Sequence, residues 1–216
     1  MVNFFRAALG AIKSPKTDVS PVGFLLKSCF YHLRGKHIFS HHNTRVIGLR
    51  NISINDRLYI GTPKIGFLTH GDQSFVNVQG RLQIMGEPVT LGKGCRVDIG
   101  PGAKCMLEGC AIGGMSRLII AHHLTIGAGS LISWGCEFLD DDWHTVEYPD
   151  RRHRPPGITI GKSVWIGSHV TVLKGVRIAD GCVVAARSVV TESMDETNAL
   201  IAGHPARIIK RNVQWS

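Results

Sequence analysis

A histidine close to several carboxylates is the most chemically suggestive arrangement in this sequence. The run from Asp140 to His144 reads Asp-Asp-Asp-Trp-His. An imidazole titrates near neutral pH, and an acidic neighbour orients its ring and stabilises the imidazolium that forms when the ring takes up a proton. His144 is therefore a candidate general base, and Asp142 is the acidic neighbour that we favour as its partner. The nearby acidic alternatives are Asp140, Asp141 and Glu147.

This run lies in a segment that differs from the sequence on both sides. Residues 139–157 carry no repeat and are rich in Asp, Arg, His and Pro. The sequence before and after them is periodic, so a segment of this composition does not fit the same regular structure. We predict that residues 139–157 form a projecting loop.

The periodicity is clearest after this loop, where aliphatic residues recur every six positions. A helix repeats its apolar face every 3.6 residues and a strand every 2. A period of six, with a second small or apolar residue four positions later, therefore suits short strands separated by regular corners. The six positions are Ile160, Ile166, Val172, Ile178, Val184 and Val190.

Three such strands make one triangular coil of about 18 residues, and successive coils stack at the ~4.8 Å spacing of hydrogen-bonded strands. The pattern therefore predicts an all-β solenoid, a parallel β-helix. It stacks Ile178 on Ile160, Val184 on Ile166 and Val190 on Val172. The same phase continues more weakly upstream, with slips of register that predict irregular early coils, at Leu91, Val97, Ile120, Ile126, Ile132 and Phe138.

Composition and charge limit the class of protein. The chain has 216 residues, 44% of them hydrophobic, and 25 glycines, which suits one turn-rich β domain. A formal net charge of +9 favours an anionic partner, such as coenzyme phosphates, a nucleotide, nucleic acid or an anionic lipid surface. No apolar run approaches the ~20 residues of a membrane span, so we expect a soluble cytoplasmic protein. Cys95, Cys136 and Cys182 occupy inward positions of the repeat and are expected to be buried core residues.

The chain divides into three parts. Residues 1–44 suggest two short amphipathic helices, within 2–12 and 24–33; residues 45–201 form the β-helix; residues 202–216 form a basic tail. Three hypotheses remain for the helices. They cover the open end of the solenoid, they pack on a partner chain, or, with interleaved lysine and arginine, they contact the inner membrane face as a peripheral anchor.

Several stretches resemble a known family. Residues 158–168 (ITIGKSVWIGS), 173–178 (LKGVRI), 188–191 (SVVT) and 202–207 (AGHPAR) are similar to the left-handed β-helix, hexapeptide-repeat acyltransferases. The similarity is greatest to the maltose and galactoside acetyltransferases and the O-acetyltransferases of bacterial surface polysaccharides. It implies a left-handed solenoid, a homotrimer with sites between subunits, and transfer of an acetyl group from acetyl-CoA to a sugar or glycan hydroxyl.

The resemblance also implies roles for particular residues. His144 matches the family's base, which takes the proton of the acceptor hydroxyl while its oxygen attacks the thioester directly, without an acyl-enzyme. A backbone N–H would stabilise the oxyanion. The resemblance implies no role for a metal. The coenzyme-binding positions carried over from the family are Trp165, Ser168, Ala185, Ala186, Thr191, Arg207 and Lys210.

The sequence departs from the family pattern at the phosphate-binding end. Ala185-Ala186-Arg187-Ser188 stands where Gly-Ala-Gly-Ser is common, and Thr191-Glu192-Ser193 where Thr-Lys-Asp is common. We hypothesise that Arg187 replaces the missing lysine at a coenzyme phosphate. The acceptor is not identified by the sequence; its suggested contacts are Trp134, Trp143, Tyr148 and Arg151.

Four other functions remain open. They are N-acetylation of a nucleotide-linked amino sugar, a serine acetyltransferase, a γ-carbonic-anhydrase-like metal enzyme and a non-catalytic scaffold. The metal hypothesis draws on His122, His123, His144 and His169, whose spacing does not match that family's ligand set. Nucleic-acid binding is not expected, because the basic residues lack interleaved aromatic residues and no recognition motif is present.

Overall fold

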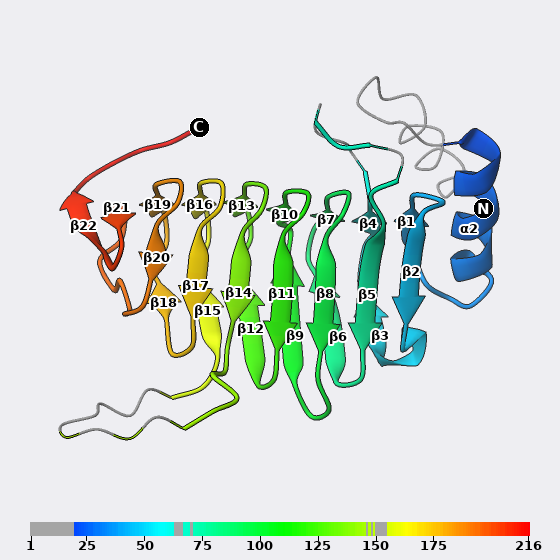
Figure 1. Cartoon of the computed structure of the whole chain (residues 1–216). Helices are drawn as coiled ribbons and strands as arrows, with labels where there is room; N and C mark the ends of the chain where they lie inside the picture. Colours follow the sequence, from blue (N-terminus) through cyan, green and yellow to red (C-terminus); the bar gives the residue numbers. More distant parts are fainter. Residues whose placement is uncertain (1–19, 63–66, 70, 146, 148, 150–154) are drawn as a thin grey trace.

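The computed structural model describes residues 20–62, 67–69, 71–145, 147, 149 and 155–216. They form a three-sided parallel β-helix whose coils follow one another along one axis in the left-handed sense (Figure 1). The predicted fold class is therefore confirmed. The helix expected within residues 2–12 lies outside the described residues, as do Tyr148 and Arg151.

Three sheets form the sides of the prism. Sheet 1 contains β1 (Ile38–Ser40), β4 (Leu58–Ile60), β7 (Val89–Leu91), β10 (Ala111–Ile112), β13 (Leu131–Ile132), β16 (Trp165–Ile166), β19 (Val183–Val184), β21 (Leu200–Gly203) and β22 (Ala206–Lys210). Sheet 2 contains β2 (Thr44–Ile47), β5 (Ser74–Val78), β8 (Arg96–Ile99), β11 (Arg117–Ile120), β14 (Glu137–Leu139), β17 (Thr171–Leu173) and β20 (Val189–Val190). Sheet 3 contains β3 (Ile52–Ile54), β6 (Arg81–Met85), β9 (Lys104–Glu108), β12 (His123–Ile126), β15 (Ile158–Ile160) and β18 (Arg177–Ile178).

The six-residue ladder has the predicted register. Ile160 pairs with Ile178, Ile166 with Val184, and Val172 with Val190, all in parallel strands. All six side chains are buried, as are the six upstream residues that keep the same phase. The ladder thus forms internal columns, and burial of one aliphatic side chain contributes about 1.5–3 kcal/mol.

The early coils are longer than the late ones, which explains the slips of register. Trp165 pairs with Val183, 18 positions later, whereas Arg96 pairs with Arg117, 21 positions later. The extra residues lengthen the strands of sheets 2 and 3: β8 and β9 have four and five residues, whereas β17 and β18 have three and two. The structure therefore confirms the prediction that the early coils are irregular.

The three corners of the prism provide a reference for the site. The first corner joins sheet 1 to sheet 2, the second corner joins sheet 2 to sheet 3, and the third corner joins sheet 3 to sheet 1. In Figure 1 the first corners lie along the upper edge and the second corners along the lower edge. The described residues next to β14 and β15 leave the lower edge as the two ends of a projecting loop.

The N-terminal end of the solenoid carries a helix, α2 (Pro21–His32). The helix begins there because the Ser20 hydroxyl accepts a hydrogen bond from the Gly23 N–H and Pro21 supplies a suitable first residue. Phe24 and Tyr31 are buried on its inner face, and the helix packs beside β1 (Figure 1). The first strand, β1, lies inside the range 1–44 that the sequence assigned to the N-terminal segment. A 3₁₀ turn, η1 (Leu49–Asn51), joins β2 to β3.

The C-terminal end closes differently. β22 turns back antiparallel to β21, so part of the expected basic tail is a strand. The chain then runs back toward the third corner, where the Trp215 Nε1–H donates to the Ser163 carbonyl at 2.8 Å. The core contains small residues as well as aliphatic ones, and Cys95, Cys136 and Cys182 are buried in it as predicted. All six cysteines are free thiols.

Candidate active site

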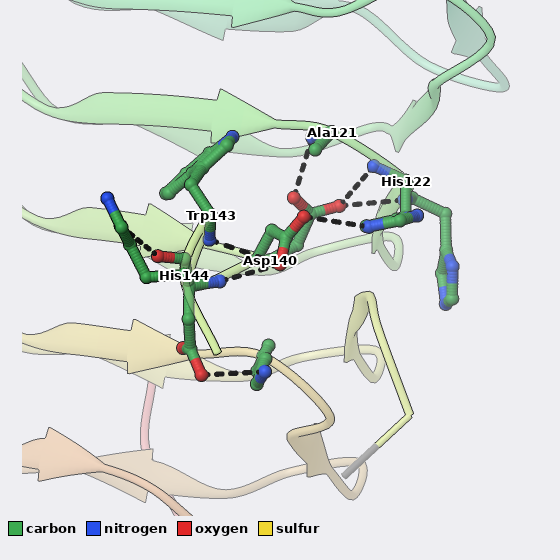
Figure 2. A network of polar contacts seen from close by, with 9 residues as sticks. Ala121, His122, Asp140, Trp143 and His144 are labelled. Atoms are coloured by element: carbon green, nitrogen blue, oxygen red, sulfur yellow. Dashed lines mark hydrogen bonds and ion pairs between the residues drawn. The ribbon is translucent and has the colours of Figure 1, made fainter. Parts of the chain in front are cut away.

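The projecting loop is fixed where it leaves the second corner. The Asp140 side chain is buried and accepts hydrogen bonds from three successive backbone N–H groups of the preceding coil, those of Ala121 at 2.7 Å, His122 at 2.8 Å and His123 at 2.8 Å (Figure 2). A carboxylate that accepts several N–H bonds is held rigidly. Asp140 is therefore an anchor of the loop and is not available as the acidic partner of His144.

His144 follows this anchor on an exposed turn. Its Nδ1 lies 3.3 Å from the main-chain carbonyl oxygen of Asp142. Because a carbonyl only accepts hydrogen bonds, this contact favours the neutral ring with its proton on Nδ1, the tautomer in which Nε2 has a free electron pair. The turn before it is tight, since Trp143 adopts the left-handed conformation at φ +55°. The arrangement presents a basic nitrogen on the surface of the loop.

The Asp142 carboxylate has a different partner. Its Oδ2 lies 2.6 Å from Nζ of Lys174, which stands at the second corner of the following coil. The expected carboxylate contact with His144 is thus replaced, within the described residues, by a contact through the main-chain carbonyl of the same residue. Asp142 attaches the loop to the coil after it.

Asp141 attaches the loop to the coil before it. Its Oδ2 lies 3.1 Å from Nε2 of His122, and its Oδ1 accepts from the N–H groups of Asp142 at 2.7 Å and Trp143 at 3.3 Å. Desolvation acts to raise the pKa of Asp141, but the hydrogen bonds from His122 and the two N–H groups hold this pKa below its ordinary value. The Asp141 carboxylate is therefore ionised at neutral pH.

The residues expected to line the coenzyme arm gather at the first corner. Trp165 lies on β16 with its side chain exposed, and Ser168 follows at the corner. The next coil places Ala185 and Ala186 beside them: the Arg187 N–H donates to the Ser168 carbonyl at 2.9 Å. The small side chains of Ala185 and Ala186 add little bulk to the surface of this corner. A Cβ on Gly167 would lie only 2.6 Å from the Ala186 nitrogen, so the two coils are in close contact here.

The residues expected at the phosphate end come from two elements. Arg207 and Lys210 are exposed on β22, and Thr191 follows β20. The Arg207 guanidinium lies 3.8 Å from the carboxylate of Glu192, the residue after Thr191. Thr191 and Arg207 are thus near one another at the C-terminal end of the solenoid, with an acidic side chain beside them.

One chain does not bring the base and the coenzyme-lining corner together. His144 projects from the second corner, whereas Ser168, Ala185 and Ala186 lie at the first corner (Figure 1). At about 3.3 Å per residue, the extended stretch from Gly135 to Asp140 between these corners covers roughly 16 Å.

Two side chains at the site were not predicted from the sequence. His122 contacts the loop from the coil before it, 19 residues before Asp141, and Lys174 contacts it from the coil after it, beyond the loop insertion. Among the histidines considered for a metal, His169 lies at the first corner and His122 at the second. Within the described ranges, no group of three or more His, Cys, Asp or Glu side chains is arranged to hold a metal ion.

None of the helices in the described part of the chain is long and apolar enough to cross a membrane.

Comparison with known proteins identifies the repeat. A family model described as "Bacterial transferase hexapeptide (six repeats)" matches residues 157–192. The chain is 37% identical over 202 residues to the "Uncharacterized 24.8 kDa protein in cps region" of Klebsiella pneumoniae, covering 92% of this chain and 90% of that protein. It is 33% identical over 138 residues to the "Putative lipopolysaccharide biosynthesis O-acetyl transferase WbbJ" of Escherichia coli (strain K12), covering 58% of this chain and 70% of that protein.

A solved structure has the same architecture. The polySia specific acetyltransferase NeuO superimposes with a TM-score of 0.54 at 23% sequence identity, covering 84% of this chain and 82% of that chain. The matched repeat, the left-handed prism and the two relatives all indicate the same family. The chain belongs to the hexapeptide-repeat acyltransferase family of enzymes.

Proposed function

We propose that this protein is an acetyl-CoA-dependent O-acetyltransferase that acts on a hydroxyl group of a sugar or surface polysaccharide, with His144 as the general base. The observation that carries the proposal is the contact between His144 Nδ1 and the Asp142 carbonyl, which leaves Nε2 able to accept a proton. It is supported by the relative WbbJ, whose name describes an O-acetyl transferase of lipopolysaccharide biosynthesis.

In the proposed reaction, His144 Nε2 removes the proton of the acceptor hydroxyl while its oxygen forms a bond to the thioester carbonyl carbon. The carbon–sulfur bond then breaks, and the proton passes from His144 to the leaving thiolate. Acetyl-CoA supplies the acetyl group as a thioester. A backbone N–H of the coil wall stabilises the negative charge that develops on the carbonyl oxygen. No acyl-enzyme forms.

The first corner has the properties that a coenzyme A arm requires. Ala185 and Ala186 have small side chains and Trp165 offers an exposed aromatic surface, which suits a long, thin pantetheine chain. Arg207, Lys210 and Arg187 are exposed cations that suit phosphate groups. Thr191 and Ser168 add hydroxyl groups near the two ends.

The separation of the two corners favours a site shared between chains. His144 of one subunit would meet Ser168, Ala185 and Ala186 of its neighbour if the prisms stood side by side in a homotrimer. This arrangement joins the base to the coenzyme without moving the Asp140 anchor. The trimer is therefore part of the proposal.

We place the protein in the cytoplasm, where acetyl-CoA is available and where six free cysteines suit a reducing compartment. Peripheral contact with the inner membrane face is proposed through the outer side of α2. There the side chains of Leu26 and Leu33 are 68% and 84% exposed, in line with Val22 and Phe30. Lys27 does not contribute, because its ammonium group donates to main-chain carbonyls of the first coil.

Thiol release from acetyl-CoA with a panel of acceptors tests the proposal. The panel contains galactosides, oligosialic acid, O-antigen oligosaccharides and a dTDP-linked amino sugar. We expect acceptor-dependent thiol release with a hydroxyl sugar and an alkali-labile acetyl ester in the product. An alkali-stable amide, formed with the amino sugar alone, would support N-acetylation instead. Absence of coenzyme binding and of turnover with every acceptor would favour a scaffold.

A further inference from the structure

The turn that carries His144 is attached to the coil before it and to the coil after it. Asp141 pairs with His122 at 3.1 Å, and Asp142 pairs with Lys174 at 2.6 Å. The carbonyl that faces His144 belongs to Asp142, the second of these two attached residues. Its direction therefore depends on contacts that lie outside the loop itself.

The attachment through Asp141 acts most directly on the shape of the turn. One carboxylate oxygen accepts from the N–H groups of Asp142 and Trp143, and the other contacts His122 (Figure 2). The first set of contacts closes the turn at Trp143. This residue adopts the left-handed conformation, which is uncommon for a residue with a Cβ. The second fixes the carboxylate against the prism. The backbone of His122 is held by a further contact, because its main-chain N–H donates to the buried Asp140 at 2.8 Å.

We propose that His122 is a positioning residue for the reaction: acting through Asp141, it holds the Asp142 carbonyl where it sets the tautomer and direction of the His144 ring. This inference rests on the proposed role of His144 as the base. Removal of the His122 ring leaves one Asp141 oxygen without its partner on the prism. The turn then samples other conformations, and the fraction of molecules with a correctly directed Nε2 falls.

The tautomer of His144 gives a test that needs no acceptor. In protein labelled with nitrogen-15 at histidine, long-range proton–nitrogen correlation distinguishes Nδ1–H from Nε2–H rings, and His144→Gln assigns the His144 signal. We expect the Nδ1–H form in the wild type and a mixture of both forms in His122→Ala. His122→Gln retains an N–H donor and is expected to restore the wild-type form. An unchanged His144 signal in His122→Ala overturns the proposal.

Steady-state kinetics with acetyl-CoA and the best acceptor of the panel give the second test. His122→Ala is expected to lower kcat about five- to tenfold, with the KM for acetyl-CoA unchanged, and His122→Gln to recover most of the loss. Asp141→Asn is expected to behave like His122→Ala. A matched control is His37→Ala, at an exposed histidine on the N-terminal coil. An equal loss in His122→Gln and His122→Ala, or a change confined to KM, contradicts the positioning role.

The outcomes separate this inference from the proposed function. Wild-type turnover in His144→Ala would remove the base assignment whatever the His122 variants do. Loss of turnover in His144→Ala, together with full kcat in His122→Ala, would remove only the positioning role. Thermal unfolding of each variant shows whether a loss of activity follows from loss of the fold. If His122→Ala unfolds at a much lower temperature than the wild type, His122→Gln and Asp141→Asn are compared with the wild type instead.

Discussion

His144 Nδ1 faces the main-chain carbonyl of Asp142 at 3.3 Å, while the carboxylate of the same aspartate lies 2.6 Å from Lys174 Nζ. The residue that orients the base therefore does so through its backbone. In the proposed mechanism, the carboxylate contributes only by keeping the loop attached to the next coil. This division of roles leads to the first prediction.

Asp142→Asn is expected to lower kcat less than about fivefold, because a half-exposed ion pair contributes at most about 1 kcal/mol. Lys174→Met should have an effect of similar size. Steady-state rates at saturating acetyl-CoA measure both. A loss of a hundredfold or more in Asp142→Asn would show that the carboxylate itself is the acidic partner of His144.

Removal of a cation at the phosphate end is expected to weaken coenzyme binding. Arg207→Ala should raise the KM for acetyl-CoA about tenfold with little change in kcat, since one charge-assisted contact to a phosphate contributes about 1.5–3 kcal/mol. Arg187→Ala tests the hypothesis that this residue replaces the family's lysine. The matched control is Arg211→Ala, whose side chain pairs with Glu196 at 2.8 Å. Equal KM values for Arg207→Ala and Arg211→Ala would contradict the assignment.

The buried cysteines predict a pH dependence of stability. Burial raises the pKa of Cys95 and of Cys110 to about 12, and of Cys136 to about 11, from an ordinary value of 9.0. The unfolded chain therefore loses these protons first as the pH rises, so stability is full below about pH 9 and falls between about pH 9 and 12. Denaturant unfolding at pH 7.5 and pH 10 measures the difference. Cys136→Ser, which retains a small side chain with a hydroxyl that does not ionise in this range, should show a weaker decline.

The ladder residues are expected to dominate stability. Ile166→Ala should lower the free energy of unfolding by about 2–5 kcal/mol, because Ile166 is fully buried between neighbouring coils. Leu131→Ala provides a control, since its side chain is 46% exposed on the strand beside β16. Urea titration followed by circular dichroism compares the two. Similar losses of unfolding free energy in both variants would mean that the interior columns do not dominate the stability of the fold.

The outer side of α2 predicts binding to lipid. The full chain is expected to sediment with vesicles of phosphatidylglycerol and phosphatidylcholine, and Leu26→Glu together with Leu33→Glu should reduce the bound fraction several-fold, because each change puts a charge where apolar side chains would be buried. Vesicles of phosphatidylcholine alone separate charge attraction from apolar insertion. Equal binding of wild type and the double variant would exclude this face as the contact.

The sequence predicted the solenoid because its evidence is local and repeated. Each of Ile160, Ile166 and Val172 is one member of a column, and the register follows from the spacing alone. The early coils were less clear because longer strands in sheets 2 and 3 lengthen them, as between Arg96 and Arg117. The first strand at Ile38 was missed for the same reason, since no six-residue period reaches it.

The candidate site was predicted only in part. The cluster around His144 was visible because its members are adjacent in the chain. Its attachments were not, since Lys174 comes from the coil that follows the loop and His122 from the coil that precedes it. The choice of Asp142 failed in one respect: sequence proximity gives no information on whether a side chain or its carbonyl contacts the ring.

The most direct test of the central claim is the turnover of His144→Ala and His144→Asn, measured as acceptor-dependent thiol release from acetyl-CoA, with coenzyme binding followed in parallel by calorimetry. Loss of a general base costs about 10²- to 10⁴-fold in kcat. We predict a loss in this range in both variants, with the dissociation constant for coenzyme A within about twofold of wild type. Turnover close to wild type in either variant would contradict the assignment of His144 as the base.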